Sequence, residues 1–179
     1  MANFTKIETG IEGLVIIEVK KYGDHRGYFK ETYQKEVFTE LGLDHEFVQE
    51  NESYSKKNTL RGLHFQVKHP QGKLVRVVSG TVYDVGVDLR PDSKTYGKWY
   101  GVELSGENGK MFYVPEGFAH GFLVKSEEAV FTYKCTDYYH PEDEGGIIWN
   151  DPTLNIDWQV EDISQLLISE KDQKLPRLK

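Results

Sequence analysis

Residues 73–89 read KLVRVVSGTVYDVGVDL, and this stretch shows the pattern that dominates the chain. Valine-rich runs with period-two alternation predict two β-strands, 73–79 and 81–89. Gly80 lies between them and is expected to form a tight hairpin turn. In the second run the apolar and acidic residues separate onto opposite faces, so one face is expected to be dry and the other polar. The apolar set is Tyr83, Val85 and Val87, and the acidic set is Asp84 and Asp88.

The same alternation continues on both sides of this stretch, with glycine-rich breaks between short runs. The further predicted strands are 14–20, 27–33, 59–66, 97–104, 110–114, 120–124 and 129–136, and the pattern also returns from residue 47 onward. Residues 34–41 differ, because Val37, Phe38 and Leu41 follow a helical spacing that stops at Gly42. We expect one short helix there.

Many short strands joined by short turns predict an all-β fold, a sandwich or barrel with a few short helices. The chain has 179 residues, which suits a single domain over 1–179. Residues 149–152 (WNDP) interrupt regular structure, and 163–172 is short and mixed. We expect residues 150–179 to form a tail with helix-like turns packed on the barrel, whose polar-lined mouth would hold a ligand.

Charge and composition exclude several classes. The chain carries 22 Lys+Arg against 29 Asp+Glu, a net charge of −7, which disfavours a nucleic-acid-binding surface. The single cysteine, Cys135, cannot form an internal disulfide, and we interpret it as a packing residue. The first residues lack the apolar core of a secretory signal, and no apolar run is long enough to span a membrane. A reduced, cytoplasmic protein is expected.

His64 in the run LRGLHFQ at 60–66 is the leading candidate for chemistry. An imidazole titrates near neutrality, so in a cavity beside cations it could act as a general base, although a hydrogen-bonded core histidine is the alternative. A metal site would need several clustered histidines or carboxylates. Because His64 and His120 each stand alone in their segments, we predict no metal and no other cofactor.

Four cations lie in or beside the predicted strands, namely Arg26, Arg61, Lys73 and Arg76. Each could be a solvated surface charge. Together, in an acidic chain, they could instead hold a phosphate group, with neighbouring aromatic rings available for a base to stack on. A phosphate loop of the GxxxxGK[ST] type is absent from the sequence, which disfavours ATP hydrolysis.

Several motifs together resemble a known family. They are NxSxS at 51–55, LRGLHFQ at 60–66, GKLVR at 72–76, GTVYDV at 80–85, PEGFAHGF at 115–122 and YKxTxYY at 133–139. In their order and spacing they are similar to the nucleotide-sugar epimerases of the cupin superfamily, and most closely to the dTDP-4-dehydrorhamnose 3,5-epimerases. The resemblance covers about residues 13–172.

The resemblance implies a metal-free jelly-roll homodimer that acts on dTDP-4-dehydro-6-deoxy-D-glucose and inverts C3 and C5 to give dTDP-4-dehydro-L-rhamnose. It implies that His64 is the base, Asp172 its orienting carboxylate, Tyr133 the acid on the opposite face and Lys73 a cation near the C4 oxygen. Such an opposed acid and base suit epimerisation next to a ketone, because the proton must return from the other face.

The resemblance also implies a set of substrate-binding residues. Arg26 and Glu31 would reach the nucleotide from the partner subunit, through an N-terminal segment (residues 1–45) exchanged between subunits. The remaining expected contacts are Gln49, Asn51, Arg61, His120, Tyr138, Glu144 and Lys171. An epimerase that inverts only C3 or only C5 in another deoxysugar pathway, and a non-catalytic nucleotide-sugar binding module, stay open as alternatives. The final product, such as the rhamnose of a lipopolysaccharide, is also open.

Overall fold

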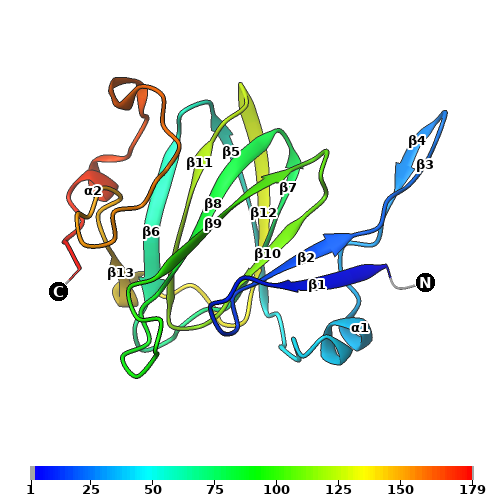
Figure 1. Ribbon diagram of the computed structural model, residues 1–179, viewed down its shortest axis with the longest axis horizontal. Coiled ribbons are helices and arrows are strands. Elements are labelled where there is room, and N and C mark those ends of the chain that lie inside the picture. Colours follow the sequence, from blue (N-terminus) through cyan, green and yellow to red (C-terminus); the bar gives the residue numbers. More distant parts are fainter. Residues whose placement is uncertain (1–2, 179) are drawn as a thin grey trace.

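The computed structural model describes residues 3–178, in which two antiparallel sheets pack face to face (Figure 1). The first sheet has the order β1-β2-β10-β7-β12-β5 and the second β13-β6-β11-β8-β9. The first is built from β1 (Phe4–Glu8), β2 (Val15–Val19), β5 (Gln49–Lys56), β7 (Lys73–Ser79), β10 (Met111–Val114) and β12 (Glu128–Cys135). The second is built from β6 (Leu60–Gln66), β8 (Thr81–Asp88), β9 (Trp99–Ser105), β11 (Phe118–Val124) and β13 (Glu144–Gly146). The predicted all-β jelly roll is confirmed.

Gly80 does not form the predicted hairpin. It connects β7 to β8, which lie in different sheets, so the chain crosses from one sheet to the other there. The residue has a φ of 80°, and a Cβ would collide with the carbonyl oxygen of Glu128. Glycine is therefore required by the backbone conformation and by the close approach of β12. Alternation alone cannot tell a hairpin from a crossing between sheets.

Both faces of β8 are buried, so the predicted polar face does not meet solvent. Its outward apolar residues, Tyr83, Val85 and Val87, pack in a cluster with Leu154 and Trp158 of the C-terminal tail. Its acidic residues Asp84 and Asp88 have 0% exposure. Their charges are tolerated because each carboxylate is hydrogen-bonded inside the protein, Asp84 to His120 and Asp88 to the Arg90–Thr95 loop.

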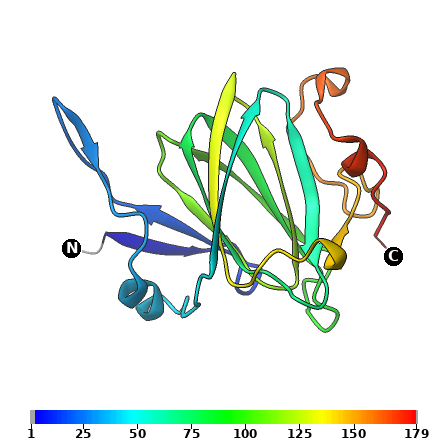
Figure 2. The ribbon, with the colours of Figure 1, turned by 180° about the vertical axis from the view of Figure 1, so that it is seen from behind.

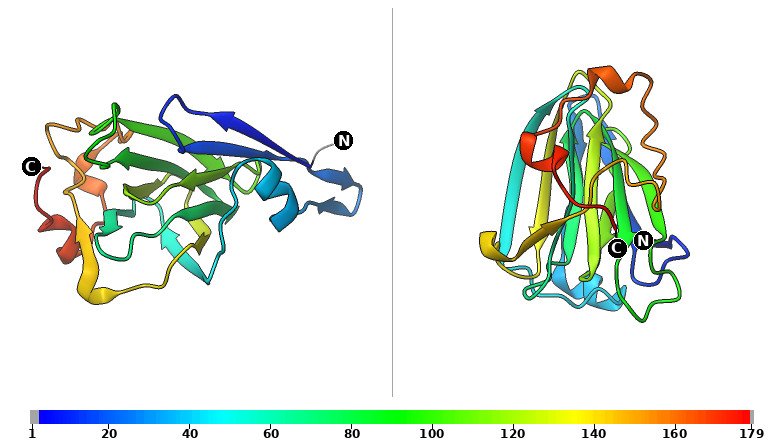
Figure 3. Two further views of the ribbon diagram at one scale, coloured as in Figure 1. Left: turned by 90° about the horizontal axis from the view of Figure 1, so that it is seen from below. Right: turned by 90° about the vertical axis from the view of Figure 1, so that its left-hand side faces the viewer.

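The sandwich is covered on both outer faces. The six-stranded sheet buries Phe4, Ile17 and Met111 against Phe38 of α1 (Lys35–Glu40). The tail covers the five-stranded sheet with 3₁₀ turn η2 (Ile163–Gln165) and helix α2 (Glu170–Gln173), as Figures 2 and 3 show. A further 3₁₀ turn, η1 (Pro141–Asp143), precedes β13. Within residues 3–178, no helix is both long and apolar enough to cross a bilayer.

The aromatic strand predicted over 27–33 is shorter than expected. The pair β3 (Tyr22–Asp24) and β4 (Gly27–Phe29) forms a separate two-stranded hairpin, and residues 30–34 have no regular structure. This hairpin projects away from the sandwich (Figures 1 and 3). Tyr28 is 57% exposed and Phe29 67% exposed, so its rings lack a covering surface within the described chain.

Candidate active site

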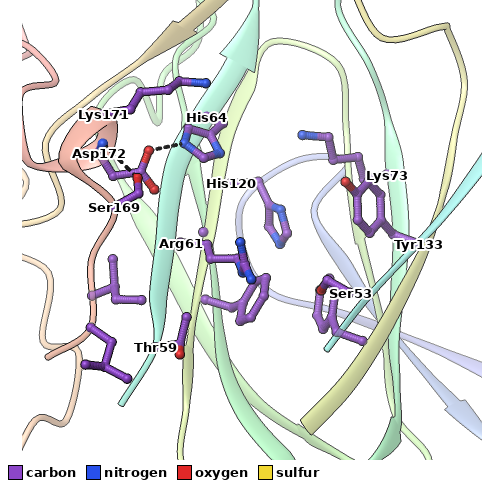
Figure 4. Close-up of a pocket in the computed structure, with 15 residues that line it drawn as sticks. Ser53, Thr59, Arg61, His64, Lys73, His120, Tyr133, Ser169, Lys171 and Asp172 are labelled. Carbon is purple, nitrogen blue, oxygen red and sulfur yellow. Dashed lines mark hydrogen bonds and ion pairs between the residues drawn. The ribbon is translucent and has the colours of Figure 1, made fainter. Parts of the chain in front are cut away.

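A cavity of about 380 Å³ opens between the two sheets, with side chains from both sheets and from the tail on its walls (Figure 4). A second cavity of about 300 Å³ adjoins it and shares His64, Lys73 and Tyr133 with it. Figure 4 shows His64 on the wall near the tail and Lys73 with Tyr133 on the facing wall. The cavity lies at the barrel mouth, where polar residues were expected.

An irregularity in β6 places Arg61 and His64 in the same cavity. Strict alternation would send these two side chains to opposite faces of the sheet. In the pairing with β11, His120 lies opposite His64 and Phe122 opposite Arg61, so β6 contains one extra residue between the two pairs. At this point the glycines of both strands meet, because a Cβ on Gly62 would lie 2.6 Å from Cα of Gly121.

His64 is held by Asp172, as predicted. Its Nε2 lies 2.7 Å from Oδ1 of Asp172, and the other carboxylate oxygen accepts the backbone N–H of Gly62 at 3.1 Å. Asp172 is 4% exposed. Its burial alone would raise its pKa, but the hydrogen bond and charge of His64 and the Gly62 N–H outweigh that effect, so the pKa lies below its usual value. An ionised Asp172 accepts a hydrogen bond from the Nε2–H group of His64, which leaves Nδ1 with a free lone pair.

Ser169, which was not among the predicted site residues although Ser169-x-x-Asp172 has the spacing of a helix cap, positions Asp172. It is the N-cap of α2, and its hydroxyl oxygen accepts the backbone N–H of Asp172 at 3.1 Å. The C-terminal tail therefore does more than cover the sheet: it supplies the carboxylate that orients His64.

Lys73 and Tyr133 occupy the opposite wall, on the neighbouring strands β7 and β12. The Lys73 side chain opens onto the cavity, yet the surrounding protein desolvates its ammonium and lowers its pKa. Within residues 3–178 this ammonium has no hydrogen-bond or ion-pair partner. Burial raises the pKa of the Tyr133 phenol, with the nearby Cys135 contributing in the same direction. Tyr133 is therefore a protonated hydrogen-bond donor at neutral pH, and it lines the same cavity as the unpaired ammonium of Lys73.

His120 lies on β11 and forms a second imidazole–carboxylate pair, with Asp84. Its Nε2 is 2.9 Å from Oδ1 of Asp84, and His120 is 8% exposed. Burial raises the pKa of Asp84, while the neighbouring His120 acts in the opposite direction. His120 was predicted as a substrate contact, and it does line the larger cavity. Its partner Asp84 was identified only as part of a polar face.

The other predicted substrate contacts fall into two groups. Gln49, Asn51 and Glu144 line the smaller cavity, whereas Arg61 and Lys171 line the larger one. Lys171 donates to Glu144 at 2.6 Å, and so ties the tail to β13. Tyr138 is 59% exposed and lines neither cavity, while its neighbour Tyr139 lines the smaller one and donates to Glu144 at 2.8 Å. The sequence run Tyr138-Tyr139 gives no means of choosing between the two.

Arg26 and Glu31 lie away from both cavities within one chain. Arg26 is at the tip of the β3–β4 hairpin, where its guanidinium pairs with Asp24 at 2.6 Å and its side chain is 79% exposed. Glu31 accepts a hydrogen bond from Asn3. Neither residue therefore contributes to the cavities of its own chain.

Two phenylalanine rings and one hydroxyl without a hydrogen-bond partner in residues 3–178 also line the larger cavity. Phe122 of β11 and Phe131 of β12 stack with ring centroids 4.3 Å apart, which joins the two sheets. The Ser53 hydroxyl lines the same cavity, is buried and has no hydrogen-bond partner within the described chain. A buried hydroxyl normally finds a partner, so Ser53 is a candidate contact for a bound sugar that the sequence did not reveal.

Cys135 is buried, and burial raises its pKa to about 11, which keeps it a neutral thiol in the core. Among residues 3–178, the group of three potential metal ligands that the structure brings together is His69, Asp137 and His140, none of which lines either cavity. The histidines of the cavity, His64 and His120, each face a single carboxylate.

Comparison with known proteins shows one family throughout. The family model described as dTDP-4-dehydrorhamnose 3,5-epimerase matches residues 8–179. A dTDP-4-dehydrorhamnose 3,5-epimerase from Methanothermobacter thermautotrophicus is 56% identical over 173 residues, which cover 97% of this chain and 94% of that protein.

Solved structures agree with the sequence relatives. The crystal structure of dTDP-4-dehydrorhamnose 3,5-epimerase from Elizabethkingia anophelis superposes with a TM-score of 0.93 at 49% identity, covering 98% of this chain and 97% of that one. The dTDP-6-deoxy-D-glucose-3,5-epimerase from Legionella pneumophila, in complex with dTDP-4-keto-L-rhamnose, gives a TM-score of 0.92 at 49% identity, covering 98% and 99%.

Proposed function

The chain belongs to the dTDP-4-dehydrorhamnose 3,5-epimerase family, and we propose that it inverts C3 and C5 of dTDP-4-dehydro-6-deoxy-D-glucose to give dTDP-4-dehydro-L-rhamnose. One observation carries the proposal: the imidazole of His64, oriented by Asp172, faces the phenol of Tyr133 across a cavity between the two sheets (Figure 4). Inversion next to a ketone needs a base on one side of the sugar and an acid on the other.

The proton transfers follow from these side chains. Nδ1 of His64 takes the proton from a carbon beside the C4 ketone, and the electrons of the broken C–H bond move toward the C4 oxygen to form an enolate. The Lys73 ammonium stabilises this negative charge, more strongly in a partly desolvated site than in water. Tyr133 then protonates the same carbon from the opposite face. Solvent returns a proton to the phenolate and takes one from the imidazolium.

The same steps, repeated at the second carbon, complete the double inversion. Both C3 and C5 flank the C4 ketone, so one base, one acid and one cation serve both positions. Arg61, Gln49, Asn51, Glu144 and Lys171 surround the cavities and would hold the rest of the nucleotide sugar.

We further propose a homodimer that acts in the cytoplasm. The exposed rings of the β3–β4 hairpin support a dimer, because Tyr28 and Phe29 would be covered by a second copy. In that arrangement Arg26, which lines neither cavity of its own chain, would enter the partner's cavity and bind the diphosphate.

Incubation with dTDP-4-dehydro-6-deoxy-D-glucose in deuterated water, followed by proton NMR, tests the reaction. We expect deuterium at both C3 and C5. Label at C3 alone or C5 alone would assign a single-position epimerase, and label at neither carbon would exclude catalysis on this substrate.

Two variants test the assignment of the base and acid. His64→Ala should abolish exchange at both carbons while the fold is kept, as checked by far-UV circular dichroism. Tyr133→Phe should slow inversion more than exchange, because the base would still remove the proton but the acid on the other face would be missing. Normal turnover in His64→Ala would contradict the base assignment.

A further inference from the structure

Three potential metal ligands meet outside the two cavities. His69 lies in the loop between β6 and β7, and Asp137 and His140 follow β12. Their donor atoms all lie within 4.8 Å of one another. The two imidazole rings stack with centroids 4.1 Å apart, and Nδ1 of His69 is 3.7 Å from Oδ2 of Asp137. These positions are adjacent in space although about 70 residues separate the loops, since residues 69 and 140 differ by 71.

The polypeptide holds the two loops in this arrangement through Gln66. Its side-chain amide donates to the carbonyl of His69 at 2.6 Å and to the carbonyl of Tyr138 at 3.1 Å. Its side-chain oxygen accepts the backbone N–H of His140 at 2.8 Å. Gln66 is 7% exposed, so this bridge is shielded from water. The backbones of both histidines are therefore fixed before any ligand arrives.

Two further side chains hold the same loops. The Asp143 carboxylate accepts the backbone N–H groups of Lys68 and His69, at 2.8 and 2.7 Å. Gln71 donates to the carbonyl of Asp137 at 2.9 Å. Only the three donor side chains would have to turn to bind an ion, which keeps the entropy cost of ordering the site low.

We propose that His69, Asp137 and His140 bind one divalent transition-metal ion, for which Zn²⁺ is the reference. Two imidazoles and one carboxylate are a donor set that suits Zn²⁺, Co²⁺, Ni²⁺ or Cu²⁺ and does not suit Mg²⁺ or Ca²⁺. The three side chains are 48%, 37% and 31% exposed, which leaves room for water to complete the coordination.

A fourth side chain orients one of the ligands. Oε1 of Glu142 lies 3.2 Å from Nδ1 of His140. A carboxylate on one imidazole nitrogen fixes the tautomer and makes the other nitrogen a better metal ligand. The bound ion would join the β6–β7 loop to the segment after β12, and so stabilise the folded chain without touching the reacting groups.

The test is calorimetric titration of the untagged protein with ZnCl₂ at neutral pH. We expect one Zn²⁺ per chain and a rise in Tm with added Zn²⁺. His69→Gln and His140→Gln should each weaken binding by more than about tenfold and remove the rise in Tm, because each loses one imidazole ligand. His25→Gln, which changes an exposed histidine in the β3–β4 turn, is the matched control and should bind like the wild type.

A second probe reports the ligands directly. Co²⁺ should give visible d–d absorption in the wild type that is lost in His140→Gln and is not displaced by excess MgCl₂. The proposal is overturned if no saturable Zn²⁺ binding occurs below about 1 mM, or if binding survives both His69→Gln and His140→Gln. If a histidine variant fails to fold, Asp137→Asn keeps the side-chain shape and replaces it as the test. It should weaken Zn²⁺ binding, and unchanged binding would overturn the proposal.

Discussion

Asp172 shows how one carboxylate can orient a neighbouring imidazole, that of the proposed base His64. It is buried, ionised and bonded to both His64 and the Gly62 backbone, so it holds the imidazole in the tautomer that presents Nδ1 to the cavity. We expect Asp172→Asn to lower kcat by roughly 10²- to 10⁴-fold, because an amide can stabilise the wrong tautomer. Steady-state kinetics would measure this. An unchanged KM would show that the loss lies in the chemical step.

The charge on Lys73, which is proposed to serve the reaction, makes the folded state less stable. Desolvation lowers the pKa of its ammonium, so the charged form is less favourable in the folded chain than in the unfolded one. This cost is full below the lowered pKa, shrinks as pH rises from there, and is gone above the ordinary lysine pKa of about 10.4.

Lys73→Met should therefore raise the free energy of unfolding at pH 7, by roughly 1 kcal/mol, while it removes turnover. Urea denaturation and the deuterium-exchange reaction measure the two effects on the same sample. Lys134→Met on the exposed side of the neighbouring strand, where the lysine pairs with Glu50, is the control and should give no gain in stability. A loss of stability in Lys73→Met would contradict the desolvation argument.

At the scale of the element, the loop after β8 depends on one buried carboxylate. Asp88 accepts bonds from the Arg90 guanidinium at 2.9 and 2.8 Å and from the hydroxyls of Ser93 and Thr95 at 2.6 and 2.7 Å. Burial acts to raise its pKa, but these donors outweigh it and hold the pKa well below its usual range. The loop is thus organised around a charge inside the protein rather than around an apolar cluster.

Asp88→Asn should lower the free energy of unfolding at pH 7 by roughly 1.5–3 kcal/mol, because charge-assisted hydrogen bonds are lost. A depressed carboxyl pKa stabilises the fold above the unfolded value of about 3.9, and the contribution is lost as pH falls toward the folded value. The difference between wild type and variant should therefore shrink below about pH 4. Chemical denaturation over a pH series would check this, and a constant difference would contradict it.

At the scale of the whole molecule, the proposed exchange of Arg26 between subunits has a direct test. Arg26→Ala and His64→Ala chains would each be inactive or weakly active alone. When they are unfolded, mixed in equal amounts and refolded, half of the dimers are mixed, and one of the two sites in each mixed dimer is intact. We expect about one quarter of wild-type activity. No recovery would mean that Arg26 serves its own chain's site, and full activity of Arg26→Ala alone would mean that it serves none.

The fold class and most strand positions could be predicted because alternation leaves a local trace. Asp172 and Tyr133 were expected at the site only through the resemblance to the family, because the tail and β12 carry no local pattern that distinguishes them from a surface carboxylate and a core aromatic. Gly80 could not be placed correctly, because a glycine at a crossing between sheets looks like a hairpin glycine. The pairing of Asp84 with His120 depends on the register of β8 and β11, which no local pattern contains. The His69–Asp137–His140 group likewise arises only when two distant loops meet.

The stacked rings of Phe122 and Phe131 join the two sheets in the wall of the cavity. His64 belongs to one sheet and Tyr133 to the other, so the spacing of the sheets sets how far apart the proposed base and the proposed acid stand. The gap in which a sugar ring would lie is therefore tied to how tightly the aromatic core packs.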